Sequence, residues 1–172
     1  MLRWLWLSLV VIGLDQVTKQ WAEAALMAYR PQSFLPFFDL TLMYNKGAAF
    51  SFLSSQGGWQ RWLFIVLAIG VTLALVVWLK RLKAGEGGLA VALSLVIGGA
   101  VGNVIDRILF GHVIDFIDVY YVAGSCLPFF ATLITNEGVQ CHWPAFNIAD
   151  SAITLGVVIL LFDAFFSKRE EA

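Results

Sequence analysis

Two aspartates carry most of the chemical information in this chain: Asp115 in the motif Val-Ile-Asp-Phe and Asp150 in the motif Phe-Asn-Ile-Ala-Asp. Both stand at the edges of long apolar runs. An ionised carboxylate at membrane depth costs about 2.5–3.5 kcal/mol on insertion scales, so such a residue usually marks a function. Two carboxylates in one site repel each other, so one stays charged while the other keeps a proton. The sequence therefore predicts that Asp115 and Asp150 form an acid–base pair that acts on one water molecule.

Three other interpretations of these residues are weaker. Asn147 is well placed as a helix N-cap, with Asp150 in the first turn near the helix dipole, but capping does not explain Asp115. His112 and His142 could join the two aspartates around a metal ion, yet their spacing matches no compact zinc motif. No serine lies in a Gly-x-Ser-x-Gly turn. We therefore expect neither a metal nor another cofactor in the chemistry.

The composition is that of a membrane protein. Of the 172 residues, 60% are hydrophobic and 13% are charged. A soluble domain carries roughly 25% charged residues. The net charge is −1 and the basic residues form no stripe, so no nucleic-acid partner is expected. The length suits a single domain over 1–172.

Four apolar stretches are each long enough to cross a bilayer, which takes about 20 residues per helix. They cover about 2–26, 59–79, 88–110 and 149–166. The first could be a cleaved signal peptide, but Ala22-Glu23-Ala24 is a poor cleavage site, so we expect a retained helix. The predicted fold is a mainly α bundle of four transmembrane helices with a small β-sheet at its outer face.

The basic residues near the helix ends predict the orientation. They fall on one side, which we take as the cytoplasm: Arg3, Lys80, Arg81, Lys83, Lys168 and Arg169. Both termini then face the cytoplasm, and the segments 27–58 and 111–148 face outward. Asp115 and Asp150 are therefore expected near the outer, periplasmic face.

The two outer segments differ in pattern. Apolar and polar residues alternate over 38–43, a turn follows at Asn45-Lys46-Gly47, and 48–53 could return as a second strand. This predicts a β element over about 37–53. A long outer loop is predicted over about 117–146, with 122–141 as a surface loop or a short helix at the membrane interface. Cys126 and Cys141 in this loop are either disulfide-bonded or two unpaired thiols.

Several polar residues interrupt the apolar helices. Asp15 and Lys19 are four residues apart on one helix face, where they could lessen the insertion cost, organise a site, or do both. Asn103, Asp106 and Arg107 share another face, beside a glycine-rich packing seam over 98–102. Either Asp106 and Arg107 pair to fix the packing, or Asn103 and Arg107 bind the aspartate motifs or the substrate backbone.

Five motifs in chain order resemble those of the bacterial lipoprotein signal peptidase family, also called signal peptidase II. They are Asp15-Gln16-x-x-Lys19, Asn45-x-Gly47-Ala48-Ala49-Phe50, Gly102-Asn103-x-x-Asp106-Arg107, Val113-x-Asp115-Phe116 and Phe146-Asn147-x-Ala149-Asp150. The resemblance covers essentially the whole chain. It implies an intramembrane aspartic endopeptidase of the bacterial inner membrane. This family removes signal peptides from diacylglyceryl-modified prolipoproteins by cleaving before the lipid-modified cysteine.

The resemblance also implies residue roles and partners. Asp115 and Asp150 match the catalytic pair of the family. The positions that match its other motifs, and that would bind substrate or organise the site, are Asn45, Gly47, Asn103, Arg107, Asn147, Ala149, Asp15, Lys19 and Asp106. The implied partners are a lipid-modified prolipoprotein, membrane lipid and an inhibitor of the globomycin type.

Two other classes of protein remain as alternatives. In a small ion or proton-coupled transporter, Asp15, Asp106, Asp115 and Asp150 would line the transport path. Against this, the polar groups cluster near one membrane face, and no paired broken helices indicate inverted repeats. A structural membrane scaffold would leave the aspartates unexplained.

Overall fold

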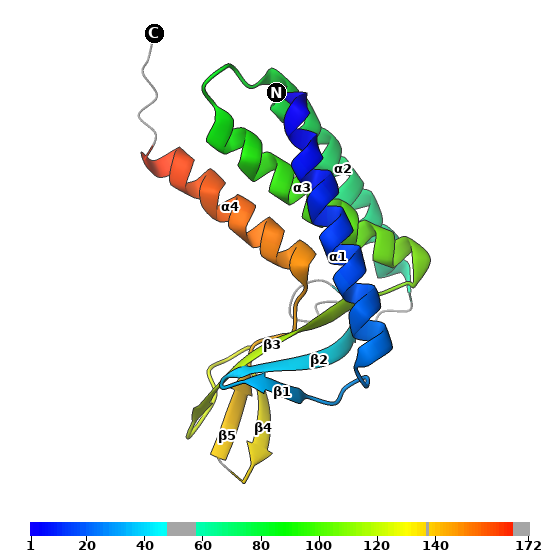
Figure 1. Ribbon diagram of the computed structural model, residues 1–172, viewed down its shortest axis with the longest axis vertical. Coiled ribbons are helices and arrows are strands. Elements are labelled where there is room, and N and C mark those ends of the chain that lie inside the picture. The colour runs from blue at the N-terminus through cyan, green and yellow to red at the C-terminus, as the bar shows by residue number, and fades with distance from the viewer. Residues whose placement is uncertain (48–57, 137, 167–172) are drawn as a thin grey trace. The chain divides into compact units, whose positions relative to one another are not determined.

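The computed structural model describes residues 1–47, 58–136 and 138–166 of the chain. The predicted return strand over 48–53 and the basic residues Lys168 and Arg169 lie outside the described residues. Within them, a short 3-10 helix at Leu2–Trp4 precedes four long helices, which begin and end close to the predicted limits (Figure 1). These helices are α1 (Leu5–Ala25), α2 (Trp59–Arg81), α3 (Gly87–Leu109) and α4 (Ile148–Phe166).

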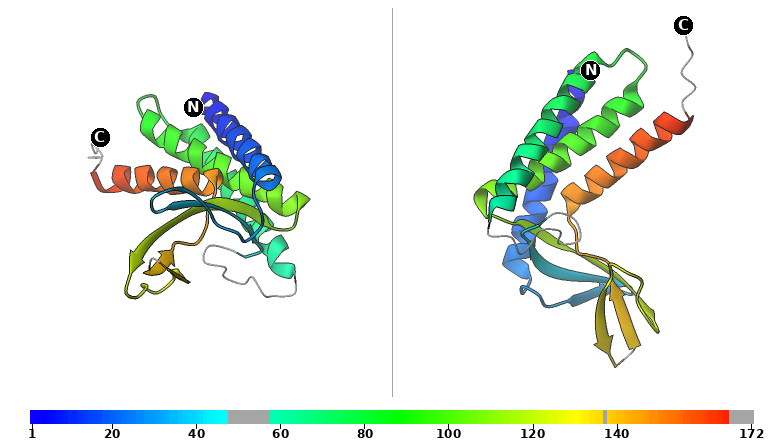
Figure 2. Two further views of the ribbon diagram at one scale, coloured as in Figure 1. Left: turned by 60° about the horizontal axis from the view of Figure 1, so that its bottom comes forward. Right: turned by 180° about the vertical axis from the view of Figure 1, so that it is seen from behind.

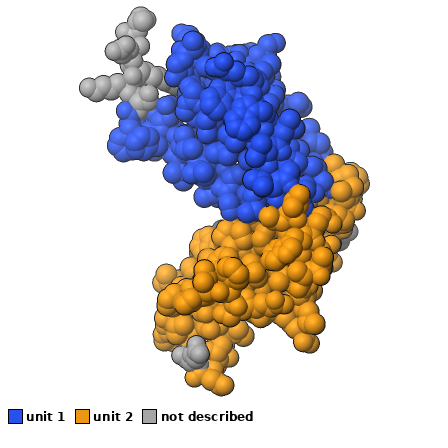
Figure 3. All heavy atoms as spheres, in the orientation of Figure 1, with its two compact units in different colours: residues 1–16, 65–105, 148–172 blue, residues 17–64, 106–147 orange. Residues whose placement is uncertain are grey.

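The chain divides into two compact units, which Figure 3 colours separately. Unit 1 comprises residues 1–16, 65–105 and 148–172, and its described elements are all helical. Unit 2 comprises residues 17–64 and 106–147 and contains the strands. Each unit takes segments from distant parts of the sequence, so neither could be recognised as a continuous stretch. The single domain expected from the length stays a prediction.

Three of the described helices, α2, α3 and α4, are long and apolar enough to cross a membrane. Along α2, large apolar side chains such as Val66 and Leu73 are more than half exposed. A helix that is apolar all round is suited to lipid, because it needs no polar face toward water. In the second half of α1, Asp15, Lys19 and Glu23 replace apolar residues, which lowers its hydropathy. The prediction of four spans is thus supported for three helices.

Small residues bring the helices of unit 1 into close contact. A Cβ atom added to Gly98 would lie 2.9 Å from the carbonyl oxygen of Ser8 in α1. One added to Gly99 would lie 2.3 Å from the carbonyl oxygen of Ala149 in α4. Beside this seam, the Ser8 hydroxyl donates a hydrogen bond of 2.7 Å to the backbone of Ser94. The predicted packing role of the glycines in α3 is therefore confirmed, because only glycine leaves room for these neighbours.

The five strands of unit 2 form one antiparallel sheet in the order β1-β2-β3-β5-β4. They are β1 (Gln32–Leu35), β2 (Phe38–Asn45), β3 (Val113–Ala123), β4 (Ala131–Thr135) and β5 (Gly138–His142). Strand β3 pairs with β2 over its first part and with β5 over its last four residues. Figures 1 and 2 show β4 and β5 as a hairpin at that end of β3.

The predicted loop over 117–146 is therefore largely strand. The interpretation of 122–141 as a surface loop or a short helix was wrong where β4 and β5 form a strand hairpin. The β-branched and aromatic residues of 119–122 and 131–135 were the available signal for strands. Of the two alternatives for the cysteines, the structure has the disulfide between Cys126 and Cys141.

We expect Gly99→Ala to lower the melting temperature of the detergent-solubilised protein. The new methyl group would overlap the backbone of α4, and overpacking of this kind costs about 1–3 kcal/mol. The matched control is Gly70→Ala in α2, where an added Cβ has no atom within 4 Å. An equal melting temperature for wild type and Gly99→Ala would contradict the close contact between α3 and α4.

Candidate functional site

Asp115 lies on β3 of unit 2 and is held by two asparagine side chains. Asp115 is 2% exposed. Asn147 Nδ2 donates to Asp115 Oδ1 at 2.7 Å, and Asn45 Nδ2 donates to Asp115 Oδ2 at 3.2 Å. Asn45 reaches Asp115 because Met43, two residues earlier on β2, is the register partner of Asp115. The strand pairing thus brings together two motifs that are 70 residues apart.

A second hydrogen bond at each of Asn45 and Asn147 fixes the orientation of its side-chain amide group. Asn45 Oδ1 accepts from the backbone N–H of Gly47 at 3.0 Å, which is the turn that asparagine forms with the residue two positions on. Asn147 Nδ2 also donates to the carbonyl oxygen of Ile114 at 3.2 Å. In both residues the NH₂ group must therefore face Asp115. The predicted N-cap residue Asn147 uses its amide group to bind β3.

Arg107 binds the same turn from α3. Its guanidinium group donates to the carbonyl oxygen of Gly47 at 3.1 Å and lies over the ring of Phe64. Arg107 therefore holds the turn that carries Asn45, the residue that binds Asp115. A guanidinium is suited to that role because it stays charged and holds its donors in a fixed plane.

A buried ion pair links α1 and α3 within unit 2. Lys19 Nζ lies 2.8 Å from Asp106 Oδ2, and both side chains are fully buried. The same carboxylate oxygen accepts from the backbone N–H of Ile114, next to Asp115, at 3.1 Å. The sequence placed Asp15 beside Lys19 on one helix face, and that pairing stays a prediction. The ion pair with Asp106 depends on which helices lie side by side.

Unit 1 contains the second aspartate, Asp150, in the first turn of α4. Asn103 of α3 donates to Asp150 Oδ1 at 2.8 Å. Asp15 of α1, which is fully buried, accepts from the backbone N–H of Ala149 at 2.9 Å. This N–H is one of the donors that a helix leaves free at its start, so Asp15 acts there as a cap from another helix. A Cβ on Gly102 would lie 2.7 Å from Asp15 Oδ2, so the glycine makes room for this carboxylate.

The predicted residues thus fall into two clusters. Unit 2 brings together Asn45, Gly47, Arg107, Asp115 and Asn147, with Lys19 and Asp106 beside them. Unit 1 brings together Asp15, Asn103, Ala149 and Asp150. That Asp115 and Asp150 act as a pair stays a prediction.

The two histidines lie in different surroundings, which the sequence did not indicate. His112 packs edge-on against Tyr44, with ring centroids 4.6 Å apart, and burial lowers the pKa of its imidazole. His142 lies 2.8 Å from Asp118, a residue that carried no sequence signal. The weak suggestion of a metal site with both histidines around Asp115 therefore does not match the contacts within unit 2.

We expect Lys19→Met to destabilise the protein strongly. It leaves the buried Asp106 carboxylate without its cation, and breaking a buried pair in this way costs about 3–5 kcal/mol. The double variant Lys19→Met with Asp106→Asn should be more stable than the single one, because the amide can still accept from Ile114. Melting temperatures in one detergent measure both effects. A double variant that is less stable than Lys19→Met would contradict the ion pair.

Comparisons with known proteins agree on one family. The family model described as signal peptidase (SPase) II matches residues 7–166. The lipoprotein signal peptidase of Pseudomonas putida KT2440 is 50% identical over 99% of this chain and 91% of its own length. The lipoprotein signal peptidase of Shewanella baltica OS155 is 45% identical over 99% of this chain and 90% of its own length.

A solved structure shares the fold of this chain. A bacterial membrane enzyme determined by the in meso method at 2.3 Å superposes with a TM-score of 0.75 at 30% identity, covering 100% of this chain and 95% of that one. The alternative of a transporter finds no support in these comparisons. Because the family model covers residues 7–166 and relatives about half identical match nearly the whole chain, this protein belongs to the signal peptidase II family.

Proposed function

We propose that this protein is an intramembrane aspartic endopeptidase with Asp115 and Asp150 as its catalytic pair. Its substrates are diacylglyceryl-modified prolipoproteins, and it cleaves before the lipid-modified cysteine. The observation that carries this proposal is the position of Asn147. Its side chain binds Asp115, and it precedes Asp150 by three residues. Three residues span at most about 11 Å of chain between Cα atoms, which suits two carboxylates that share one water.

The hydrogen bonds suggest a role for each aspartate. Both oxygens of Asp115 accept from amide N–H groups, which can only donate, so we assign Asp115 as the base that takes a proton from water. At Asp150, Oδ1 accepts from Asn103, and we assign Oδ2 as the proton donor toward the substrate carbonyl. Lys19 and Asp106 act as positioning residues, because their pair holds the backbone of Ile114 beside Asp115.

The membrane accounts for the substrate class. A diacylglyceryl group can stay in the lipid while the adjoining peptide bond enters a polar site from the side. The scissile peptide must be extended, because a helix occupies its carbonyl groups in hydrogen bonds. The sheet of unit 2 ends in the edge strands β1 and β4, and an edge strand can bind an extended peptide through its backbone. We propose that globomycin-type inhibitors compete for the same site.

We further propose that α1 is a fourth membrane span. Two of its three charged residues are compatible with lipid around the helix, because Asp15 and Lys19 are fully buried and have partners within the protein. The third, Glu23, is exposed and lies in the last turn of the helix. We propose that the membrane is the bacterial inner membrane. The basic residues Arg3, Lys80, Arg81 and Lys83 favour an orientation with both termini on its cytoplasmic side. The two aspartates then act near the periplasmic face.

We expect Asp115→Asn and Asp150→Asn each to reduce cleavage by at least about 100-fold, since an amide cannot take or give the catalytic proton. The assay is a gel shift with purified, reconstituted enzyme and a diacylglyceryl-modified prolipoprotein. The same prolipoprotein without its diacylglyceryl group should stay uncleaved. Asp163→Asn on α4, the helix of Asp150, is the matched control and should keep wild-type turnover. Normal turnover by either catalytic variant with an unchanged melting temperature would refute the pair.

A further inference from the structure

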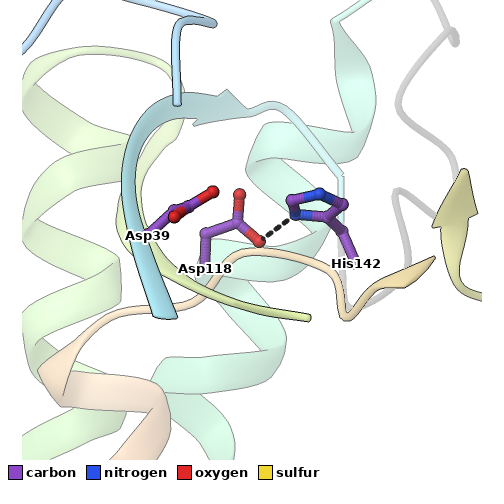
Figure 4. Close-up of side chains that lie close together, drawn as sticks. All are labelled: Asp39, Asp118 and His142. Atoms are coloured by element: carbon purple, nitrogen blue, oxygen red, sulfur yellow. Dashed lines mark hydrogen bonds and ion pairs between the residues drawn. The ribbon is translucent and has the colours of Figure 1, made fainter. Parts of the chain in front are cut away.

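Three strands of unit 2 bring a second cluster of titratable side chains together, separate from the motifs of the proposed function. It consists of Asp39 on β2, Asp118 on β3 and His142 on β5, and Figure 4 shows the three side chains pointing toward one another. Asp39 and Asp118 are direct partners in the strand register. His142 pairs with Tyr120, two residues along from Asp118 and therefore on the same face of β3.

The cluster lies on the face of β3 opposite to Asp115. Side chains alternate between the two faces of a strand, and Asp115 and Asp118 are three residues apart. A group bound at Asp118 would therefore have no direct contact with the carboxylate of Asp115. This makes the cluster a site of its own, whose occupation can be tested without reference to peptide cleavage.

One carboxylate oxygen in this cluster is buried and has no partner. Both carboxylate oxygens of Asp118 have a partner. Oδ1 lies 2.8 Å from His142 Nδ1, and Oδ2 accepts from the Thr41 hydroxyl at 2.7 Å. Asp39 is 5% exposed, and its Oδ1 atom is buried without a hydrogen-bond partner among the described residues. Leaving such an oxygen unpaired away from water is costly, so the position calls for a donor or a cation.

The charges of the cluster point to a cation. Like charges placed directly opposite each other on neighbouring strands are destabilising. Burial, and next the charge of Asp118, raise the pKa of Asp39. A single histidine side chain can balance at most one of the two carboxylates. A divalent cation would balance both and would give Asp39 Oδ1 a partner.

We propose that Asp39, Asp118 and His142 bind a divalent transition-metal ion, with Zn²⁺ as the best fit. The candidate ligand atoms lie within 4.8 Å of one another. Ligands around a tetrahedral Zn²⁺ are about 3.4 Å apart for bonds near 2.1 Å, so modest side-chain rotations would complete the site. Imidazole nitrogen together with carboxylate oxygens suits Zn²⁺, whereas Ca²⁺ and Mg²⁺ prefer oxygen ligands alone. A metal bond to His142 Nδ1 would replace the contact of that atom with Asp118 Oδ1, because the ligating nitrogen must carry no proton.

The surroundings allow an ion to reach the cluster. A cavity of about 340 Å³ adjoins it, and Asp39, Tyr120 and Gln140 are among the residues that line it. This space can hold water molecules as the remaining ligands. Gln140 Oε1 lies 3.4 Å from His142 Nε2, a contact of the kind that orients a ligating imidazole through its second nitrogen. The ion would tie β2, β3 and β5 together, so its expected role is structural.

The experiment uses the full-length protein in detergent, with any affinity tag removed and bound metal stripped by a chelator. Zn²⁺ is then titrated while the melting temperature is followed, and the zinc content is measured after gel filtration. We expect one zinc per chain. The melting temperature should rise by at least about 5 °C when free Zn²⁺ is a hundredfold above its dissociation constant. Mg²⁺ and Ca²⁺ at the same concentration should have little effect.

Two variants and one control decide whether this cluster is the site. Asp39→Asn and His142→Gln should each lose the zinc-dependent rise in melting temperature. Without zinc, Asp39→Asn should be at least as stable as wild type, because it removes a like-charge pair. His112→Gln changes the other histidine of the chain and should keep the full response. No zinc response in wild type would overturn the proposal, and so would an equal response in Asp39→Asn, which would mean adventitious binding.

Discussion

A carboxylate removed from water needs donors or a cation around it, and this constraint governs the polar groups of the protein. Asp115 meets it with two asparagine amides, Asp106 with a lysine and a backbone N–H, and Asp15 with the start of a helix. In each case the partner comes from a different segment of the chain. The buried acids therefore hold segments of the chain together, in addition to any role in catalysis. Substitution of one partner therefore affects the two secondary-structure elements that the contact joins.

Much of the organisation can be read from the sequence because it depends on local pattern. Long apolar runs predict helices, and the helices begin and end close to the predicted limits. The turn at Asn45 and Gly47 follows from residue type, and the glycines of α3 predict close packing. The aspartates stand out because a charge is rare in such surroundings.

Pairing across space could not be read in the same way. Lys19 forms its ion pair with Asp106 because α1 and α3 lie side by side there, and spacing along one helix carries no signal for that contact. The first part of strand β3 could not be predicted, because both of its faces are buried and polar and apolar residues then do not alternate. Asp118 looked like one more residue of a loop, and only the strand register reveals that Asp39 and His142 stand beside it. A single sequence carries no signal for contacts of this kind.

The disulfide between Cys126 and Cys141 has a consequence for the order of biogenesis. Such bonds form in oxidising compartments and are rare in the cytosol. In the orientation proposed above, the bond that ties Cys126 to β5 therefore forms only after this segment has crossed the membrane. A newly made chain then passes through a reduced form, and oxidation of its two thiols marks the arrival of this segment outside the cytosol.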